Sequence, residues 1–194
     1  MAESDYTEIH LPLRQLPGWG SVDAITRSAG WQVVDSNAGR GDAHYKKTVT
    51  WGVAPELWVT YVEDLITQVS VVIVFGVDGD AVGTLADRVS ALLTPYSRQD
   101  VLATPDEDTP KPDIARHLVR LALSASDAFD PEIFEKIQTA AGNSDPEIRN
   151  AAAWATVYLS WSACESLLRR MTESDPDERV RAGARMLLES LKDG

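Results

Sequence analysis

Two segments in the C-terminal half of the chain are similar to each other, and their spacing restricts the fold more than any other sequence feature. Residues 144–153 and 174–184 both pass from Ser-Asp-Pro through acidic residues and an arginine to a run of small residues. The second copy carries one extra residue, and a fainter copy lies at 111–118. With Ile114, Ile148 and Val180 taken as equivalent, the copies are 34 and 32 residues apart. A period of this length is typical of a helical solenoid.

Each copy also has the residues that begin a helix. Asp or Ser before Pro supplies an N-cap, and Pro at the first helical position loses no hydrogen bond that the helix needs. Acidic residues in the first turn (Glu147, Asp177, Glu178) complement the helix dipole. Second helices are predicted at about 131–141 and 161–172, between the copies. The C-terminal half is therefore predicted to be all-α.

The pattern Asp-Pro-x-Ile/Val-Arg-x-x-Ala resembles the HEAT-repeat consensus. The resemblance covers residues 111–194, roughly two helix pairs and a closing helix. Arg149 and Arg181 match the family arginine, whereas the first copy has Ala115 there and Arg116 one residue later. The resemblance implies a scaffold that binds proteins, although a minority of HEAT-like arrays resemble DNA glycosylases or bilin lyases. For both arginines we expect a link to a neighbouring acidic residue within the array, with partner contact as the alternative.

The N-terminal half shows the alternation of apolar and polar residues that predicts strands. Strands are expected at 7–13, 31–35, 45–51, 57–63 and 69–75, and helices at 22–29 and 81–93. Pro12 limits the first strand to a sheet edge. The β-branched run at 69–75 favours a central strand covered on both faces. The fold class is thus predicted to be α+β: an antiparallel meander of about four strands with helices on one side, followed by the helical array.

The best candidate for a domain boundary is residues 104–113, which hold three prolines and a short acidic run. Such a composition gives a stiff, exposed connector. We therefore expect an α+β domain at 1–103, a linker at 104–113 and helical repeats at 114–194. A hinge between the halves and a loop on one continuous core are both compatible with this segment.

The formal net charge is −12, and it is shared equally between residues 1–100 and 101–194. A nucleic-acid binder normally has a basic stripe, which this sequence lacks, so nucleic acid is an unlikely partner. Acidity favours solubility and, where it is focused, fast association with a basic partner. The acidic N-terminus lacks the features of a signal peptide, and the longest apolar run (69–77) is short of the about 20 residues that span a bilayer. We expect a cytoplasmic protein without a membrane partner.

Few residues suggest catalysis or ligand binding. His10, His44 and His117 lie in unrelated segments without the close spacing of metal ligands, and His117 is expected to be exposed. Cys164 is expected to be a buried structural thiol. The glycine-containing turn at 76–83 lacks the Lys-Ser/Thr of a phosphate-binding loop, so a capped helix start is the better interpretation. No catalytic residue, metal ligand or cofactor is assigned, and the chain is not expected to be an enzyme.

The candidate partner-binding residues lie in the repeats. Trp154 and Trp161 are seven positions apart and would share a face if one helix continued between them, with Arg149 and Arg181 nearby.

The predicted function is a protein-binding adaptor or scaffold, in its sharper form an immunity-type protein that neutralises a basic partner. One alternative is a HEAT-like nucleic-acid-binding or DNA glycosylase-type module with a groove lined by arginines 116, 120, 149, 169, 170, 181 and 185. Another is a small enzyme with a site in the N-terminal domain.

Overall fold

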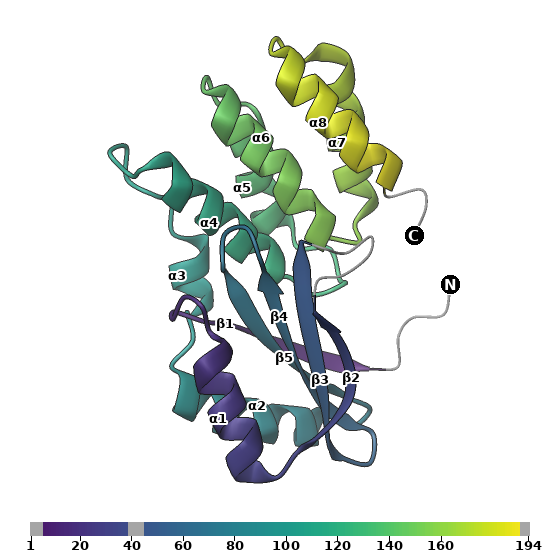
Figure 1. Cartoon of the computed structure of the whole chain (residues 1–194). Coiled ribbons are helices and arrows are strands. Elements are labelled where there is room, and N and C mark those ends of the chain that lie inside the picture. Colours follow the sequence, from purple (N-terminus) through teal and green to yellow (C-terminus); the bar gives the residue numbers. More distant parts are fainter. Residues whose placement is uncertain (1–5, 39–44, 191–194) are drawn as a thin grey trace. The chain divides into compact units, whose positions relative to one another are not determined.

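The chain divides into two compact units, residues 1–97 and 98–194 (Figure 1). The computed structural model describes residues 6–38 and 45–190. The first unit combines a sheet with helices and the second is helical, which confirms the α+β class. The division between Ser97 and Arg98 precedes the proline-rich segment 104–113, and helix α4 (Lys111–Leu123) begins within that segment.

The first unit is built on a five-stranded antiparallel sheet in the order β1-β5-β4-β3-β2. Its strands are β1 (Thr7–Pro12), β2 (Gln32–Ala38), β3 (Lys46–Ala54), β4 (Leu57–Asp64) and β5 (Ser70–Gly76). Strands β2 to β5 form the expected meander, and β1 adds a fifth strand beside β5. The edge position of β1 confirms the prediction made from Pro12. Strand β5 is an internal strand, but the middle strand is β4.

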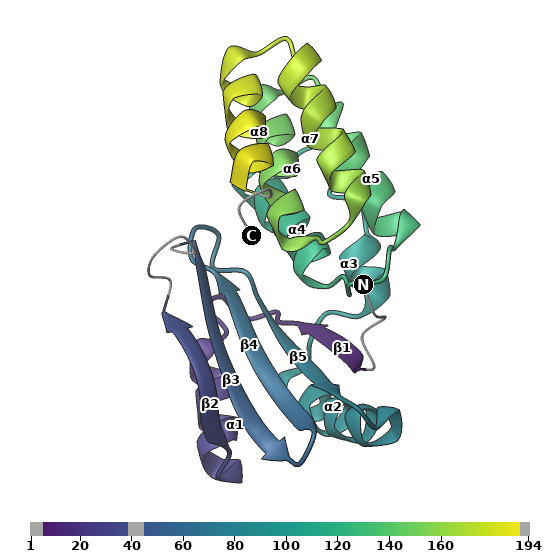
Figure 2. The same ribbon diagram turned by 90° about the vertical axis from the view of Figure 1, so that its right-hand side faces the viewer.

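Two helices, α1 (Trp19–Ala29) and α2 (Gly79–Leu93), cover one face of this sheet (Figure 2). The strand register aligns large apolar side chains on that face in two rows: Val49–Tyr61–Val72 and Trp51–Val59–Val74. Helix α1 adds Val22 to this core, and α2 adds Val82, Leu85, Ala86 and Val89. Full burial of a Val or Leu side chain contributes roughly 1.5–3 kcal/mol, so these rows fix the sheet register.

The ends of α1 and α2 follow local sequence chemistry. Gly30 ends α1 with φ of 69°, a left-handed conformation that glycine adopts without a Cβ clash. Helix α1 starts three residues before the predicted residue 22, and Gly18 is its N-cap residue. Asp78 caps α2 by accepting hydrogen bonds from the backbone N–H groups of Asp80 and Ala81, at 2.9 and 3.3 Å. The turn at 76–83 is therefore a capped helix start, as predicted.

Strand β2 is the second edge of the sheet, and most of its side chains are exposed. It pairs with β3, and no strand within residues 6–38 and 45–190 pairs with its outer side. A register shift between Val33 and Asp35 marks a β-bulge. Bulges and charged side chains are common devices that protect an edge strand from pairing with another chain.

The second unit consists of α3 (Arg98–Leu102), α4, α5 (Pro131–Ala141), α6 (Pro146–Ala155), the 3₁₀ turn η2 (Thr156–Tyr158), α7 (Ser162–Ser174) and α8 (Glu178–Ser190). Helices α4, α6 and α8 lie side by side in one layer, and α5 and α7 form a second layer (Figure 2). Membership of the HEAT-repeat class stays a prediction. Among the helices of the described ranges, none is long and apolar enough to cross a bilayer.

The predicted capping by an aspartate directly before proline is confirmed at α6, and α5 starts in the same way, whereas α4 and α8 start differently. Asp130 accepts hydrogen bonds from the N–H groups of Glu132 and Ile133, and Asp145 accepts one from Glu147, with Pro following each cap. In the last copy the extra residue delays the helix, so α8 starts at Glu178, and Asp177 accepts bonds from the backbone two and three residues later. Helix α4 starts without a side-chain cap.

Candidate functional site

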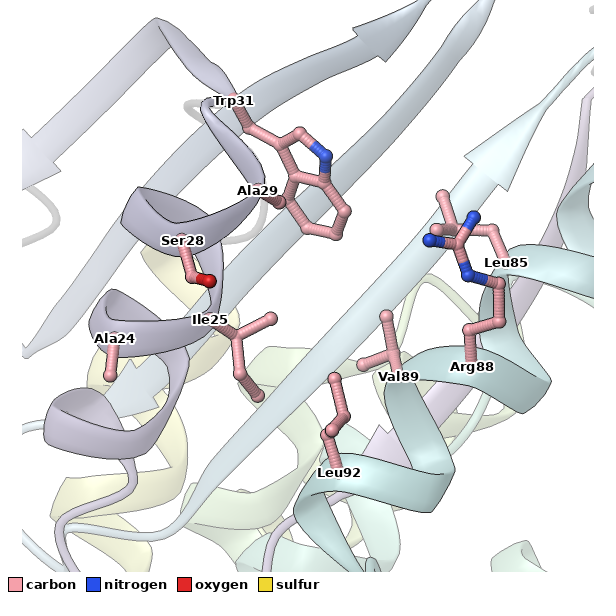
Figure 3. A pocket seen from close by; sticks show the side chains of 9 residues that line it. All are labelled: Ala24, Ile25, Ser28, Ala29, Trp31, Leu85, Arg88, Val89 and Leu92. Atoms are coloured by element: carbon pink, nitrogen blue, oxygen red, sulfur yellow. The ribbon is translucent and has the colours of Figure 1, made fainter.

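An apolar groove opens between α1 and α2 in the first unit (Figure 3). Its volume is about 430 Å³, within the range of about 300–1,000 Å³ that is common for ligand pockets. The residues that line it are Ala24, Ile25, Ser28, Ala29 and Trp31 on one side and Leu85, Arg88, Val89 and Leu92 on the other. Figure 3 shows Ile25 facing Val89 and Leu92 across the groove, with Trp31 toward one end.

Most of the α1 side chains that line the groove are small, and Ile25 is the large exception. Val22 and Thr26 of α1 are buried against the sheet, and the Thr26 hydroxyl donates to the carbonyl of Asp23 at 3.1 Å. The groove side of the same helix carries the small residues Ala24, Ser28 and Ala29. An unfilled apolar channel therefore remains between the two helices.

Several apolar side chains of this region are left in contact with water. Leu92 is 66% exposed at the end of α2, and Val33 and Val34 of the adjoining strand β2 are each 57% exposed. The side-chain polar groups in the lining are the Ser28 hydroxyl, the Arg88 guanidinium and the indole N–H of Trp31. A surface of this kind suits the apolar face of a partner better than it suits catalysis.

A second cluster in this unit contains two residues with shifted pKa values, Lys47 and Tyr61, and its role is structural. The Lys47 ammonium lies 3.4 Å from the centroid of the Trp19 ring and 5.7 Å from that of Tyr61. The Tyr61 hydroxyl donates to the Glu63 carboxylate at 3.0 Å. Burial lowers the pKa of Lys47 and raises the pKa of Tyr61. These contacts tie α1 to strands β3 and β4 through a cation–π interaction.

The two tryptophans predicted to bind a partner do not lie on one continuous helix. Helix α6 ends at Ala155 and α7 begins at Ser162, so no single helix continues from Trp154 to Trp161. Trp161 is only 5% exposed. Its Nε1–H donates to the carbonyl of Asp127 at 3.2 Å, and its ring meets Phe129 edge-on. The condition for a paired aromatic anchor is therefore not met.

The two repeat arginines make internal contacts. Arg149 is 6% exposed and forms an ion pair with the carboxylate of Asp175. Arg181 donates to the backbone carbonyl of Asp175 at 2.6 Å. Both contacts match the expected link within the array, and partner binding through these two side chains stays a prediction.

Other arginines of the predicted basic groove are also paired with carboxylates. Arg116 pairs with Asp113, and Arg169 pairs with Glu165, each at 2.6 Å. Pairing of this kind reduces the positive potential that phosphate binding needs.

The structure corrects one of the predictions for histidine and cysteine. His117 is only 8% exposed, so its expected exposure was wrong: α5 packs over it, which neighbouring residues in sequence do not reveal. His44 lies outside the described residues. Cys164 is buried as predicted, and burial raises the pKa of its thiol to about 11. Within residues 6–38 and 45–190, no group of three or more His, Cys, Asp or Glu side chains is placed to hold a metal ion.

No protein-family model, no curated protein and no solved structure matches the chain.

Proposed function

We propose that the protein binds another protein, and that the groove between α1 and α2 receives an amphipathic helix of a basic partner. The observation that supports this is the open apolar groove of about 430 Å³ with small residues on its α1 side. Grooves between two helices commonly accept a third helix, whose apolar side chains recur at every third or fourth residue. Ala24, Ser28 and Ala29 leave the depth that such side chains require.

The charge of the chain favours a basic occupant over a second copy of this protein. The formal net charge is −12, so two copies approaching each other would repel, whereas a basic partner would be attracted. In the sharper form of the proposal, the protein is of the immunity type and neutralises a basic toxin. Neutral or acidic helices would fit the groove sterically but would gain no electrostatic attraction.

Binding is placed in the first unit because two of the candidate binding residues of the repeats already have contacts within their own unit. Trp161 and Arg149 are both buried by contacts within their own unit. Leu92 and Ile25, in contrast, present apolar surface to an open groove.

The test compares two substitutions at leucine and isoleucine side chains of equal exposure. Leu92 and Ile66 are both 66% exposed, but only Leu92 lines the groove. Tagged wild-type protein, Leu92→Asp and Ile66→Asp would be used to capture proteins from native lysate, with washes at low and high salt. Any captured protein would be purified and its Kd measured by calorimetry with each variant.

The expected result is a basic protein that binds wild type and Ile66→Asp equally and is lost at high salt. Leu92→Asp should weaken its binding at least about tenfold, because the loss of apolar burial alone is worth roughly 1.5 kcal/mol. A partner that binds Leu92→Asp as tightly as wild type would refute the groove as the binding site. Affinity that does not change with ionic strength would refute charge-guided binding.

A further inference from the structure

The second unit contains a separate cavity between α4 and α5. Its volume is about 350 Å³. It is lined by the apolar residues Pro105, Ile114, Leu118, Leu121, Ala140 and Ile148, and by the polar residues Thr104, His117, Glu135, Lys136, Thr139 and Asn143. This combination of apolar walls with a few polar groups is the usual composition of a small-molecule site. The groove of the first unit has no comparable set of polar groups.

His117 is the most unusual residue of this lining. The residue is 8% exposed, and it lines the cavity together with Lys136. An imidazole in a cavity wall can donate a hydrogen bond to a molecule that enters the cavity.

The charges around His117 indicate which sign of ligand would bind. Burial, together with the positive charges of Arg120 and Lys136, lowers the pKa of His117 to about 4. A neutral imidazole keeps one N–H donor beside the Lys136 ammonium. Lys136 is held in place by its hydrogen bond to the Thr104 hydroxyl, at 2.7 Å. The carboxylate of Glu135 also lines the cavity but is exposed.

We propose that this cavity binds a small organic monocarboxylate whose carboxylate accepts hydrogen bonds from Lys136 and His117 while its apolar body packs against Ile114, Leu118 and Leu121. The apolar walls exclude a fully hydrophilic ligand, which would lose its hydration without compensation. Glu135 lies in the same lining and would repel a dianion such as phosphate more strongly than a monocarboxylate. The inference is independent of the proposed protein-binding groove, since the two sites share no residue.

The test uses sodium octanoate as the probe and the full-length protein. Binding would be measured by calorimetry, and by changes in amide chemical shifts that locate the bound probe. 1-Octanol has the same chain without the charge, and inorganic phosphate has charge without the apolar body. Lys136→Met removes the ammonium and keeps the length of the side chain. Lys46→Met, in the first unit, is the matched control.

The expected result is saturable binding of one octanoate per chain, with shifts confined to the lining of this cavity. Lys136→Met and His117→Leu should each weaken octanoate binding at least about tenfold, because each removes a donor and a charge-assisted hydrogen bond contributes about 1.5–3 kcal/mol. Lys46→Met should bind like wild type. Because His117 is buried, circular dichroism must show that His117→Leu is folded. If it is not, Lys136→Met, at a partly exposed residue, still tests the inference.

Three results would overturn the inference. The first is octanol binding as tightly as octanoate, which would mean that the charge is not recognised. The second is unchanged octanoate affinity in Lys136→Met. The third is phosphate binding more tightly than octanoate at the same residues, which would mean that the apolar walls play no part.

Discussion

The guanidinium of Arg149 and the carboxylate of Asp175 form a two-point ion pair in which both N–O distances are 2.8 Å. The same arginine donates from Nη1 to the carbonyl oxygens of Asn143 and Ser144, each at 3.0 Å. Asp175 in turn accepts from the backbone N–H of Asp177 at 2.9 Å. One arginine therefore joins the turn before α6 to the turn before α8 and sets the spacing of two neighbouring repeats.

The pair should make the stability of the second unit depend on pH. The hydrogen bonds from Arg149 lower the pKa of Asp175 below its unfolded value of about 3.9, so the contribution is present above that pH and lost as pH falls through the folded pKa. Asp175→Asn should lower the free energy of unfolding near neutral pH, and the difference from wild type should shrink at about pH 3. Urea denaturation at both pH values measures this. Asp108→Asn, at an exposed residue, is the control, and a difference that persists at low pH would contradict the pair.

The cap of α2 should be measurable separately from charge effects. Asp78→Ala removes the side chain that accepts from Asp80 and Ala81, which should cost about 1 kcal/mol. Asp80→Ala removes a negative charge from the same first turn without removing the cap, and it should cost only about 0.3–1 kcal/mol. Urea denaturation of both variants compares the two effects. An equal or smaller loss for Asp78→Ala would mean that the cap contributes nothing beyond its charge.

The elements that the sequence predicted correctly are those set by local chemistry. Asp145 and Pro146 begin α6, and α1 ends at Ala29 as predicted, because caps depend only on neighbouring residues. The sequence left open whether a helix continues from Trp154 to Trp161, because nothing local marks the 3₁₀ turn at Thr156–Tyr158.

The groove between α1 and α2 and the cavity between α4 and α5 depend on the distances between helices. The repeat period and the composition of the sequence do not give these distances. The position of His117 under α5 and the spacing between α1 and α2 are set by packing. The signal for the groove was present, however: Ala24, Ser28 and Ala29 are small on the side of α1 that holds the large Ile25. A helix face that mixes small side chains with one large apolar side chain is a candidate docking face.

Trp161 should contribute to stability rather than directly to partner binding. Its side chain is buried against Phe129, so Trp161→Ala should lower the free energy of unfolding by about 3–5 kcal/mol. Trp161→Phe keeps an aromatic ring there and loses the hydrogen bond to the carbonyl of Asp127, so its effect should be smaller. Chemical denaturation provides the measurement. If Trp161→Ala were as stable as wild type, the burial described above would be contradicted.

Cys164 should be unreactive in the folded protein. Burial raises the pKa of its thiol to about 11, so almost no thiolate is present near neutral pH. Iodoacetamide should label Cys164 quickly in concentrated urea and at least about a hundredfold more slowly in buffer, because thiolate and access are both lost on folding. Mass spectrometry of timed samples follows the labelling. Equal rates with and without urea would show that the thiol is accessible in the folded state.

His117 should titrate at acidic pH. Burial, Arg120 and Lys136 lower its pKa to about 4, whereas an unfolded histidine has a pKa of about 6.5. Between these two pKa values the unfolded chain binds more protons than the folded chain. His117 therefore lowers the free energy of unfolding as pH falls, and this decrease starts near the pKa of the unfolded histidine. NMR titration of the ring should place the midpoint below about pH 5, and His117→Gln should remove this part of the pH dependence. A midpoint near the unfolded value would mean that Glu135 or water offsets the two cations.

The centre of strand β2 bears on whether the protein remains a single chain in solution. Asp35 is the middle residue of β2, and it is exposed on the open edge of the sheet. If a second copy added its own β2 antiparallel about that centre, the two Asp35 carboxylates would face each other. Like charges directly opposite across strands are destabilising. Asp35, next to two exposed valines, therefore disfavours this pairing of two copies. A strand that placed a lysine or an arginine opposite Asp35 would not meet this repulsion.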